Sequence, residues 1–383
     1  MNYEKKYLKY KQKYIHSLSN QTGGAPEQVI IDTDPGIDDA LAILLALGSE
    51  RVNVLALTTV YGNFPDVRKL TDNALKILNL ANKREIPVYE GVSKPLGEMN
   101  LTSYIRKTMA AQSVAVHGRD GLANLSEDES FSLHKGGLEK NQEHAVDAII
   151  RLARTNPGVI TLIMLGPLTN LAAALDKEPD LPLLLKSVII MGGALFSPRG
   201  HAINTSDANL GNARPSAEAN FFKDPDAAQI VLRAGFPVER LFLVPLDLTT
   251  QTDYGDFGLE LMPVKKLPTG LNDGKITDFI ARTHDYYSNI YKGFKRDKVP
   301  FHDACAVFLA ISPESFANPI QISINVETKG ELTSGMIVID NRAHLPPTLR
   351  APDNVTYFQN IIKDNLYAAI KQSINKLQAD LPN

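Results

Sequence analysis

The stretch VIIDTDPGIDDALAILLAL, residues 29–47, decides the fold, because an apolar run leads into a cluster of carboxylates and then becomes apolar again. Residues 29–31 are typical of a buried strand and residues 40–47 of an apolar helix. The turn between them contains four carboxylates, Asp32, Asp34, Asp38 and Asp39. This pattern predicts a strand, an acidic turn and a helix in an α/β protein.

The four carboxylates repel one another, and this repulsion limits what the turn can be. Like charges a few ångströms apart raise each other's pKa, so they must share protons, bind cations or be separated by solvent. A solvated acidic turn is one interpretation. However, the turn follows the carboxyl end of a strand, which is where open α/β sheets bind their ligands. We therefore expect a ligand site.

The composition is that of an ordinary globular protein. The chain has 383 residues, of which 44% are hydrophobic and 22% charged, enough for one large α/β domain or two smaller ones. A net charge of -3 gives no electrostatic footprint for nucleic acid, and no apolar run approaches the roughly 20 residues of a membrane span. The single cysteine, Cys305, suits a reducing compartment. We expect a cytoplasmic protein without nucleic-acid or membrane partners.

Residues 1–24 form a leader that differs from the rest of the chain. Tyrosines recur in it at helical spacing among lysines, and a Ser/Asn/Gly linker follows, which predicts a short basic helix. The uninterrupted apolar segment of a secretory signal is missing. The leader is either a solvated appendage or an address or docking tag. It resembles the Tyr/Lys-rich N-termini of some proteins of large DNA viruses, and that resemblance is confined to these residues.

Residues 25–383 are predicted to form a single α/β domain, with an open, mostly parallel Rossmann-like sheet wrapped by helices. The predicted strands are 28–32, 52–59, 158–165, 187–191 and 240–246. The predicted helices include 38–47, 66–81, 142–155, 225–234, 275–293 and 357–377. Residues 93–140 and 250–272 are rich in Gly, Ser, Pro and charge, and are predicted to be loops, one of which could cover a site.

Polar motifs follow several of the predicted strands. They are VYGN (60–63), LGPLTN (165–170), MGG (191–193) and GNARPSAEANFFKDPDAA (211–228), and FHDACAV (301–307) precedes an apolar helix. A single His-Asp pair at a helix start is more often a cap than a catalyst. Several such motifs at the ends of strands favour a shared site.

The segment DTDPGIDDA (32–40) resembles the DxDPGxDDA signature of the inosine-uridine-preferring nucleoside hydrolases, and the motifs above follow in that family's order. The resemblance covers roughly residues 28–375. It implies the nucleoside hydrolase fold and Ca²⁺-dependent hydrolysis of the N-glycosidic bond of ribonucleosides, giving free base and ribose. It also implies a homodimer or homotetramer.

The resemblance implies a Ca²⁺ ion at the acidic turn, held by the side chains of Asp34, Asp39 and Asp303 and by the backbone carbonyl of Leu165. Oxygen ligands of this kind are those that Ca²⁺ takes. Asp34 would also act as the general base toward water. Asp32 would orient the turn and the ligands. A metal that serves only stability is the alternative interpretation.

The resemblance also assigns the substrate side of the site. The residues implied to hold the ribose are Asp38, Asn63, Asn212, Glu218 and Asn220. His302 stands where some members carry the acid that protonates the leaving base, and an unperturbed histidine pKa near 6.5 suits that role. A structural histidine is the alternative.

The base pocket is implied to include His117, Tyr287, Tyr291 and Met191. The purine-specific branch of the family stacks the base between tryptophans, and this chain has none. We therefore expect uridine to be preferred and inosine to come second. Tyr287 and Tyr291 are four residues apart on a predicted helix, so they could instead be core packing.

One segment is longer than in compact members of the family. Residues 194–211, ALFSPRGHAINTSDANLG, connect two elements that form the site and are rich in Gly, Ser and Asn. We expect a flap beside the pocket. Arg199 and His201 in this flap would contact either substrate or solvent.

Two other functions are compatible with parts of the sequence. A strand that ends in DxD is also how haloacid-dehalogenase phosphatases begin, with Asp32 or Asp34 as the nucleophile. The PGIDDA that follows and the distant HDACAV fit that family poorly. The second alternative is a catalytically idle family member that binds nucleosides or serves a structural role.

Overall fold

The structure is a computed structural model. It describes residues 25–97, 111, 113–128, 131, 133–195, 211–257, 275–294, 296, 298–342, 345–346, 349 and 351–381. The leader 1–24 lies outside the described residues, and so does most of the predicted flap, including Arg199 and His201. The predictions for these segments therefore stay predictions.

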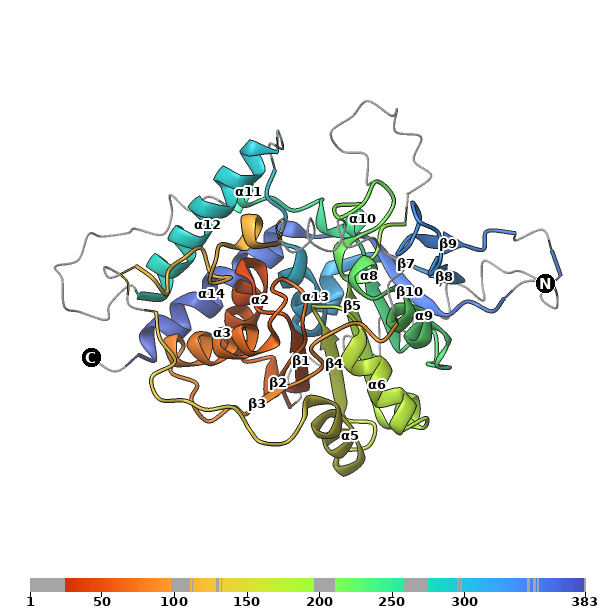
Figure 1. The fold of residues 1–383 in the computed structure, drawn as a ribbon, viewed down its shortest axis with the longest axis horizontal. Helices are drawn as coiled ribbons and strands as arrows, with labels where there is room; N and C mark the ends of the chain where they lie inside the picture. Colours follow the sequence, from red (N-terminus) through yellow and green to blue (C-terminus); the bar gives the residue numbers. More distant parts are fainter. Residues whose placement is uncertain are drawn as a thin grey trace.

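An eight-stranded, mostly parallel sheet organises the protein (Figure 1). Its strands, in spatial order, are β3 (Val88–Glu90), β2 (Val52–Thr59), β1 (Glu27–Thr33), β4 (Ile160–Met164), β5 (Ser187–Met191), β6 (Leu241–Val244), β10 (Val355–Ile361) and β7 (Phe316–Ile322). Only the edge pair β10–β7 is antiparallel. The predicted α/β fold with a mostly parallel sheet is thus confirmed.

Helices cover both faces of this sheet. They are α2 (Ile37–Gly48), α3 (Val67–Leu80), α5 (Ala145–Thr155), α6 (Thr169–Lys177), α7 (Leu181–Leu184), α8 (Ala219–Lys223), α9 (Pro225–Arg233), α10 (Leu246–Thr249), α11 (Tyr254–Phe257), α12 (Lys275–Gly293), α13 (His302–Ile311) and α14 (Lys363–Ala379). The 3-10 helix η2 (Pro313–Ser315) and a two-stranded sheet of β8 (Ile324–Val326) and β9 (Ile337–Ile339) complete the fold.

Strand β1 shows how the core is divided into two layers. Val29 and Ile31 pack in the cluster with α2, α3, α13 and α14, whereas Ile30 packs in the cluster with α5, α6 and α9. Side chains of a strand alternate between its two faces, so a strand covered on both sides must be apolar throughout. This explains the continuous apolar run at the start of the opening stretch.

The strand order places a topological switch point between β1 and β4. From β1 the chain winds outward through β2 and β3, and it then returns to β4 on the other side of β1. Ligands of open α/β sheets bind outside the carboxyl ends of the strands at this point. Asp32 pairs with Met164 in the register, so the acidic turn and LGPLTN leave the sheet side by side.

The predicted helix 357–377 is wrong at its start. Residues Val355–Ile361 form strand β10, which pairs with β6 and β7, and the helix begins only at Lys363. The segment is VTYFQNI, whose β-branched and aromatic residues favour a strand. Apolar and polar residues do not alternate in this segment, and neither does its burial, so the sequence lacked the period of two that marks a half-buried strand. The predicted strands and the other predicted helices are confirmed to within a few residues.

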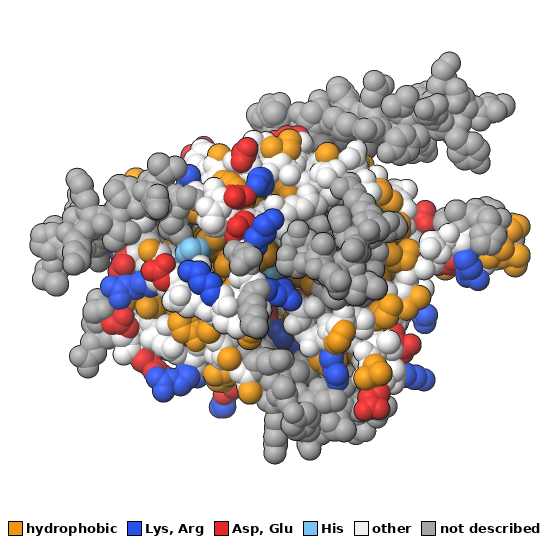
Figure 2. All heavy atoms as spheres, turned by 90° about the horizontal axis from the view of Figure 1, so that it is seen from above, with side chains coloured by type: hydrophobic (Ala, Val, Ile, Leu, Met, Phe, Trp, Pro, Cys, Tyr) orange, Lys and Arg blue, Asp and Glu red, His pale blue; other side chains and the backbone are white. Residues whose placement is uncertain are grey.

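The described surface carries charges of both signs. On the face seen from above, acidic and basic side chains are interspersed (Figure 2). Among the described helices, none combines the length and the apolar character that crossing a bilayer would require.

Candidate active site

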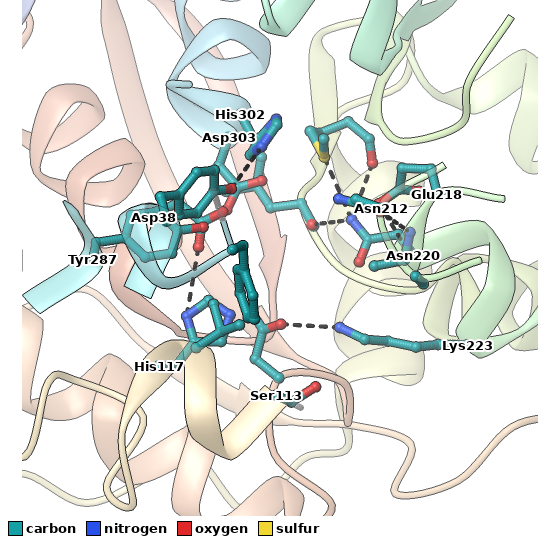
Figure 3. Close-up of a pocket in the computed structure, with 18 of the residues that line it drawn as sticks. Asp38, Ser113, His117, Asn212, Glu218, Asn220, Lys223, Tyr287, His302 and Asp303 are labelled. Carbon is teal, nitrogen blue, oxygen red and sulfur yellow. Dashed lines mark hydrogen bonds and ion pairs between the residues drawn. The ribbon is translucent and has the colours of Figure 1, made fainter. Parts of the chain in front are cut away.

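A cavity of about 390 Å³ opens at the carboxyl ends of the central strands. The predicted site residues that line it are Asp38, Asn63, His117, Leu165, Met191, Asn212, Glu218, Asn220, Tyr287, Tyr291, His302 and Asp303. Asp34 and Asp39 lie behind Asn63, which forms hydrogen bonds with both. Figure 3 shows Asp38, Tyr287, His302 and Asp303 on one side of the cavity, and Asn212, Glu218, Asn220 and Lys223 on the other.

Three carboxylates meet on the side of the cavity that carries Asp38 and Asp303. Asp38, Asp39 and Asp303 each offer an oxygen, and these oxygens lie within 4.8 Å of one another. Asp38 and Asp39 are in the first turn of α2, and Asp303 is in the first turn of α13. The N-terminus of a helix favours negative charge, so two helices that converge here lower the cost of the cluster. Burial and the neighbouring carboxylates raise the pKa of Asp303 well above its usual range.

Asp34 has one occupied oxygen and one free oxygen. Its Oδ2 accepts a hydrogen bond from the backbone N–H of Asn63 at 2.7 Å and lies 3.2 Å from Nζ of Lys223. Its Oδ1 is buried and has no hydrogen-bond partner. A Cβ at Gly62 would lie 1.9 Å from Oδ2, and one at Gly166 would lie 2.8 Å from Oδ1. The glycines of VYGN and LGPLTN therefore make room for this carboxylate.

Asp39 is oriented by four donors. Its Oδ1 accepts from the Thr33 hydroxyl at 2.5 Å and from the backbone N–H of Asp34 at 3.3 Å. Its Oδ2 accepts from the backbone N–H of Gly36 at 2.9 Å and from the Asn63 amide at 3.0 Å. These bonds fix the carboxylate relative to the start of α2. Burial raises its pKa, and the charge of Asp38 adds to that effect.

Asp32 lies one layer below the cavity and does not line it. Its Oδ2 accepts from the Thr58 hydroxyl at 2.6 Å and from the Asn170 amide at 2.7 Å. Burial raises its pKa to about 7. The same Asn170 amide donates to the carbonyl of Thr59 at 2.9 Å, and its oxygen accepts from the N–H of Val92. Asp32 and Asn170 therefore join the ends of three strand segments beneath the site.

The cluster has the properties of a cation site. Its donors are carboxylate oxygens, and Oδ1 of both Asp34 and Asp38 is buried without a hydrogen-bond partner. Hard divalent cations bind sets of oxygen ligands of this kind. The three carboxylates that lie closest together include Asp38, whereas the predicted ligand set contained Asp34 in its place. The carbonyl of Leu165, the predicted fourth ligand, accepts from the Asn220 amide at 2.6 Å.

The opposite wall presents polar side chains held by backbone groups. Glu218 caps α8 and accepts from the N–H groups of Asn220 at 2.8 Å and Gly193 at 2.9 Å. The Asn220 amide donates to the carbonyls of Leu165 and Met191. The oxygen of Asn212 accepts from the N–H of Ala219 at 2.9 Å. These hydrogen bonds fix the three side chains in place on this wall.

Tyrosines and histidines form the third wall. Tyr287 and Tyr291 on α12 contact each other edge to face, with ring centroids 4.9 Å apart. Both are buried and both line the cavity, so they serve packing and the pocket together. His302 lies between Thr249, 2.8 Å from its Nδ1, and the Tyr291 hydroxyl, 3.4 Å from its Nε2.

The two histidines are less basic than expected. Burial lowers the pKa of His302 to about 4, and the charge of Arg296 contributes, so the expected value near 6.5 is not found. Burial also lowers the pKa of His117 to about 4. Nδ1 of His117 accepts from the N–H of Ile37 at 3.2 Å, so this nitrogen carries no proton. Its separation of 3.9 Å from Asp38 is therefore a contact with a neutral ring and not an ion pair.

Several residues of the site were not predicted. Lys223, Thr249 and Arg296 contact or line it, and Lys223 is the most deeply involved. Lys223 belongs to the motif AEANFFKDPDAA, three residues after Asn220. That spacing puts two side chains on the same side of a helix, and this was the signal available in the sequence.

Comparison with known proteins gives a consistent result in sequence and in structure. Residues 29–368 match the family described as inosine-uridine preferring nucleoside hydrolase. A protein of that description from Leishmania major is 34% identical over 85% of this chain and 91% of its own length. A pyrimidine-specific ribonucleoside hydrolase of Shewanella woodyi is 34% identical over 82% of this chain and 88% of its own. The solved structure of a purine-preferring ribonucleoside hydrolase from Gardnerella vaginalis is similar with a TM-score of 0.75 at 26% identity, covering 92% of this chain and 99% of that one.

Proposed function

The chain belongs to the inosine-uridine preferring nucleoside hydrolase family, and we propose that it hydrolyses the N-glycosidic bond of ribonucleosides with the help of Ca²⁺. The observation that carries this proposal is the cluster of Asp38, Asp39 and Asp303 on one side of a cavity at the sheet's switch point. A second wall of preorganised amide and carboxylate groups faces it. This combination suits a substrate with several hydroxyl groups.

We assign the cation to the side chains of Asp34, Asp39 and Asp303 and to the carbonyl of Leu165. The free Oδ1 of Asp34 supports this assignment, because a buried carboxylate oxygen without a partner is costly. A bound divalent cation supplies positive charge that offsets the carboxylates and makes a nearby water easier to deprotonate. Asp38, the third member of the close cluster, is assigned to a ribose hydroxyl.

In the reaction, the attacking water loses a proton and the nucleobase leaves the ribose. Asp34 takes the proton as the water oxygen bonds to the anomeric carbon, and the C–N bond breaks with its electron pair going to the nucleobase. Positive charge develops on the ribose, and the surrounding carboxylates favour it. Five residues are assigned to hold the ribose in place, namely Asp38, Asn63, Asn212, Glu218 and Asn220.

The departing base needs a proton unless it is stable as an anion. We assign His302 as the donor, supported by its position in the cavity wall and its contact with the Tyr291 hydroxyl. Its pKa of about 4 leaves it almost entirely neutral near pH 7, so this role requires that His302 take up a proton in the complex with substrate.

We propose that the base binds among His117, Met191, Tyr287 and Tyr291, all of which line the cavity. The chain has no tryptophan to stack on a purine, which disfavours strict purine selection. The segments VHGRDGLAN (116–124) and NARPSAEANFFKDPDAA (212–228) resemble those of uridine-cleaving eukaryotic members, so we place uridine first and inosine second. The names of the relatives span inosine-uridine preferring, pyrimidine-specific and purine-preferring enzymes, so base preference must be measured for this chain. We also propose a cytoplasmic homo-oligomer, supported by the single cysteine and by the resemblance.

A panel of ribonucleosides tests the proposal directly. Free base and ribose should be measured for uridine, inosine, cytidine, adenosine and guanosine, with and without a chelator. Release of both products from uridine or inosine that stops with chelator and returns with Ca²⁺ is the expected result. Turnover that persists after the protein has been shown to be free of metal would refute the metal assignment.

Two added measurements, an assay of sugar phosphates and a nucleoside-binding titration, decide between the alternatives. Release of phosphate from sugar phosphates, without release of base, would favour a phosphatase. The burial of Asp32 and its bonds to Thr58 and Asn170 argue against its use as a nucleophile. Tight nucleoside binding without turnover in the presence of Ca²⁺ would favour an idle family member.

A further inference from the structure

We propose that Lys223 is a positioning residue that shares Asp34 with the divalent cation. It holds Oδ2 of Asp34 and leaves Oδ1 for the cation, which supports turnover but weakens cation binding. This inference rests on the proposed function and deepens it. It concerns one side chain that has no role among the assigned metal ligands or the residues assigned to the substrate.

Lys223 is a buried lysine held at both ends. It is the last residue of α8, and its carbonyl accepts a hydrogen bond from the Tyr61 hydroxyl at 3.0 Å. Its side chain is 8% exposed and crosses to the acidic turn, where Nζ lies 3.2 Å from Oδ2 of Asp34. Nζ also donates to the side-chain oxygen of Asn63 at 2.9 Å. Figure 3 shows Lys223 reaching into the cavity from the wall of Asn220.

Through its hydrogen bond to Asn63, Lys223 also orients a second carboxylate, that of Asp39. Because the Asn63 oxygen faces Nζ, its amide nitrogen faces the opposite way, donating to the carbonyl of Asp34 at 3.1 Å and to Oδ2 of Asp39 at 3.0 Å. A rotated amide would present its oxygen to Asp39 and repel it. Lys223 therefore orients Asp34 directly and Asp39 through Asn63.

The two oxygens of Asp34 have different surroundings. Oδ2 is held by Lys223 and by the N–H of Asn63, whereas Oδ1 is buried with no hydrogen-bond partner. On the Oδ1 side, a Cβ added at Gly166 would lie 2.8 Å from this oxygen. The geometry thus gives one oxygen to the protein and leaves the other for a cation.

The charge of Lys223 should weaken cation binding, although its hydrogen bonds should support turnover. Asp34, Asp38, Asp39 and Asp303 together carry two more negative charges than a divalent cation can balance. Lys223 balances one of these, and it also repels any cation bound to the same carboxylate. Removing the positive charge should therefore tighten cation binding while it loosens the geometry of Asp34 and Asn63. If Lys223 served only packing, its substitution would not raise cation affinity and lower turnover at the same time.

The experiment compares Lys223→Met and Lys223→Gln with the unsubstituted full-length chain. Gln removes the charge but can still donate to Asn63, so it separates charge from hydrogen bonding. Lys76→Met is the matched control, because Lys76 is a partly buried lysine that bonds Ser126 and Asn73 outside the cavity. The measurements are the Ca²⁺ dissociation constant by titration calorimetry of chelator-treated protein, and kcat for uridine at saturating Ca²⁺.

We expect both Lys223 variants to bind Ca²⁺ on the order of tenfold more tightly and to lose activity on the order of tenfold or more. The activity loss should be larger for Met than for Gln. Lys76→Met should change neither value. Affinity that is unchanged or weaker in a folded Lys223 variant would overturn the inference.

The outcomes separate this inference from the proposed function. If the unsubstituted chain binds Ca²⁺ but releases no base from any nucleoside, the proposed function fails, and the change in the dissociation constant still decides the role of Lys223. If the unsubstituted chain binds no Ca²⁺, both fail. Should Lys223→Met not fold, Lys223→Gln carries the test, with circular dichroism as the check on folding.

Discussion

Two adjoining groups of residues in the cavity, the carboxylate side and the aromatic side, are built in different ways. The carboxylate side lies at a strand end and in first helical turns, and it consists of Asp34, Asp38, Asp39 and Asp303. Backbone groups hold it, and Asp39, for example, accepts hydrogen bonds from two backbone N–H groups. The aromatic side, His117, Tyr287, Tyr291 and His302, is held mainly by contacts between side chains. Backbone groups fix position more tightly than side chains do. We therefore expect the carboxylate side to carry the chemistry common to all substrates, and the aromatic side to distinguish between bases.

The largest effect should come from Asp34→Asn on the carboxylate side. Asn keeps the shape of the side chain but removes its charge and its capacity to take a proton. We expect kcat to fall on the order of 10³-fold for every nucleoside that is cleaved. Steady-state kinetics at saturating Ca²⁺ measures this fall. Asp66→Asn is the control, because Asp66 caps α3 away from the cavity and Asn is also a good cap.

A fall in kcat that differed between uridine and inosine would contradict the division between a carboxylate side that acts on all substrates and an aromatic side that distinguishes between nucleobases. It would mean that Asp34 acts on the base and not on the shared ribose and water. A loss of less than tenfold would remove Asp34 as the general base.

His302→Ala tests the aromatic side and should act unevenly. The variant should slow uridine cleavage by roughly 10²-fold, the scale of general-acid effects. It should spare p-nitrophenyl riboside, whose leaving group departs as a stable anion. The ratio of kcat for the two substrates is the measurement. Equal slowing of both would show that His302 positions the pocket or supports the neighbouring Asp303, and its assignment as an acid should then be withdrawn.

The same division explains what the sequence could predict. The strand, turn and helix of residues 29–47 were predictable because the apolar runs and the fixed Asp, Pro and Gly positions are local. The motifs VYGN and LGPLTN were predictable as parts of one site because parallel strands end at the same edge. Whether Asp34 and Asp39 bind a metal stays a prediction.

Features that depend on packing were not predictable. The pKa of His302 follows from its burial between α10 and α12, which no local pattern records. Lys223 reaches Asp34 across 189 positions of sequence, and lysines are seldom buried, so no local pattern marks it as a site residue. The start of the predicted helix 357–377 was wrong because β10 is defined by its partners β6 and β7 and not by alternation.

A methyl group placed against the free oxygen of Asp34 gives a smaller, more local test of the carboxylate side. In Gly166→Ala the new Cβ would lie 2.8 Å from Oδ1 and 2.9 Å from a methyl of Val60, so one of them must shift. We expect Ca²⁺ affinity to fall by about tenfold, as is usual when groups around a metal ligand are disturbed. Titration calorimetry measures it. Gly293→Ala is the control, because a Cβ there meets open space.

Unchanged Ca²⁺ affinity in Gly166→Ala would show that Oδ1 does not face the cation. The assignment of Asp34 as a ligand would then have to be replaced by the close set of Asp38, Asp39 and Asp303. Such a result would leave the general-base role of Asp34 to be judged by Asp34→Asn alone.

The smallest effect should come from Tyr291→Phe, which removes one hydroxyl from the aromatic side and keeps the ring. That hydroxyl lies 3.4 Å from Nε2 of His302, near the outer limit of a hydrogen bond, so its contribution should be small. We expect kcat for uridine to fall by about threefold, with no change for p-nitrophenyl riboside. Because the edge-to-face contact with Tyr287 survives the substitution, a fall as large as that of His302→Ala could not come from lost packing. It would mean that the proton reaches the base through the tyrosine, and that the two residues act as one donor.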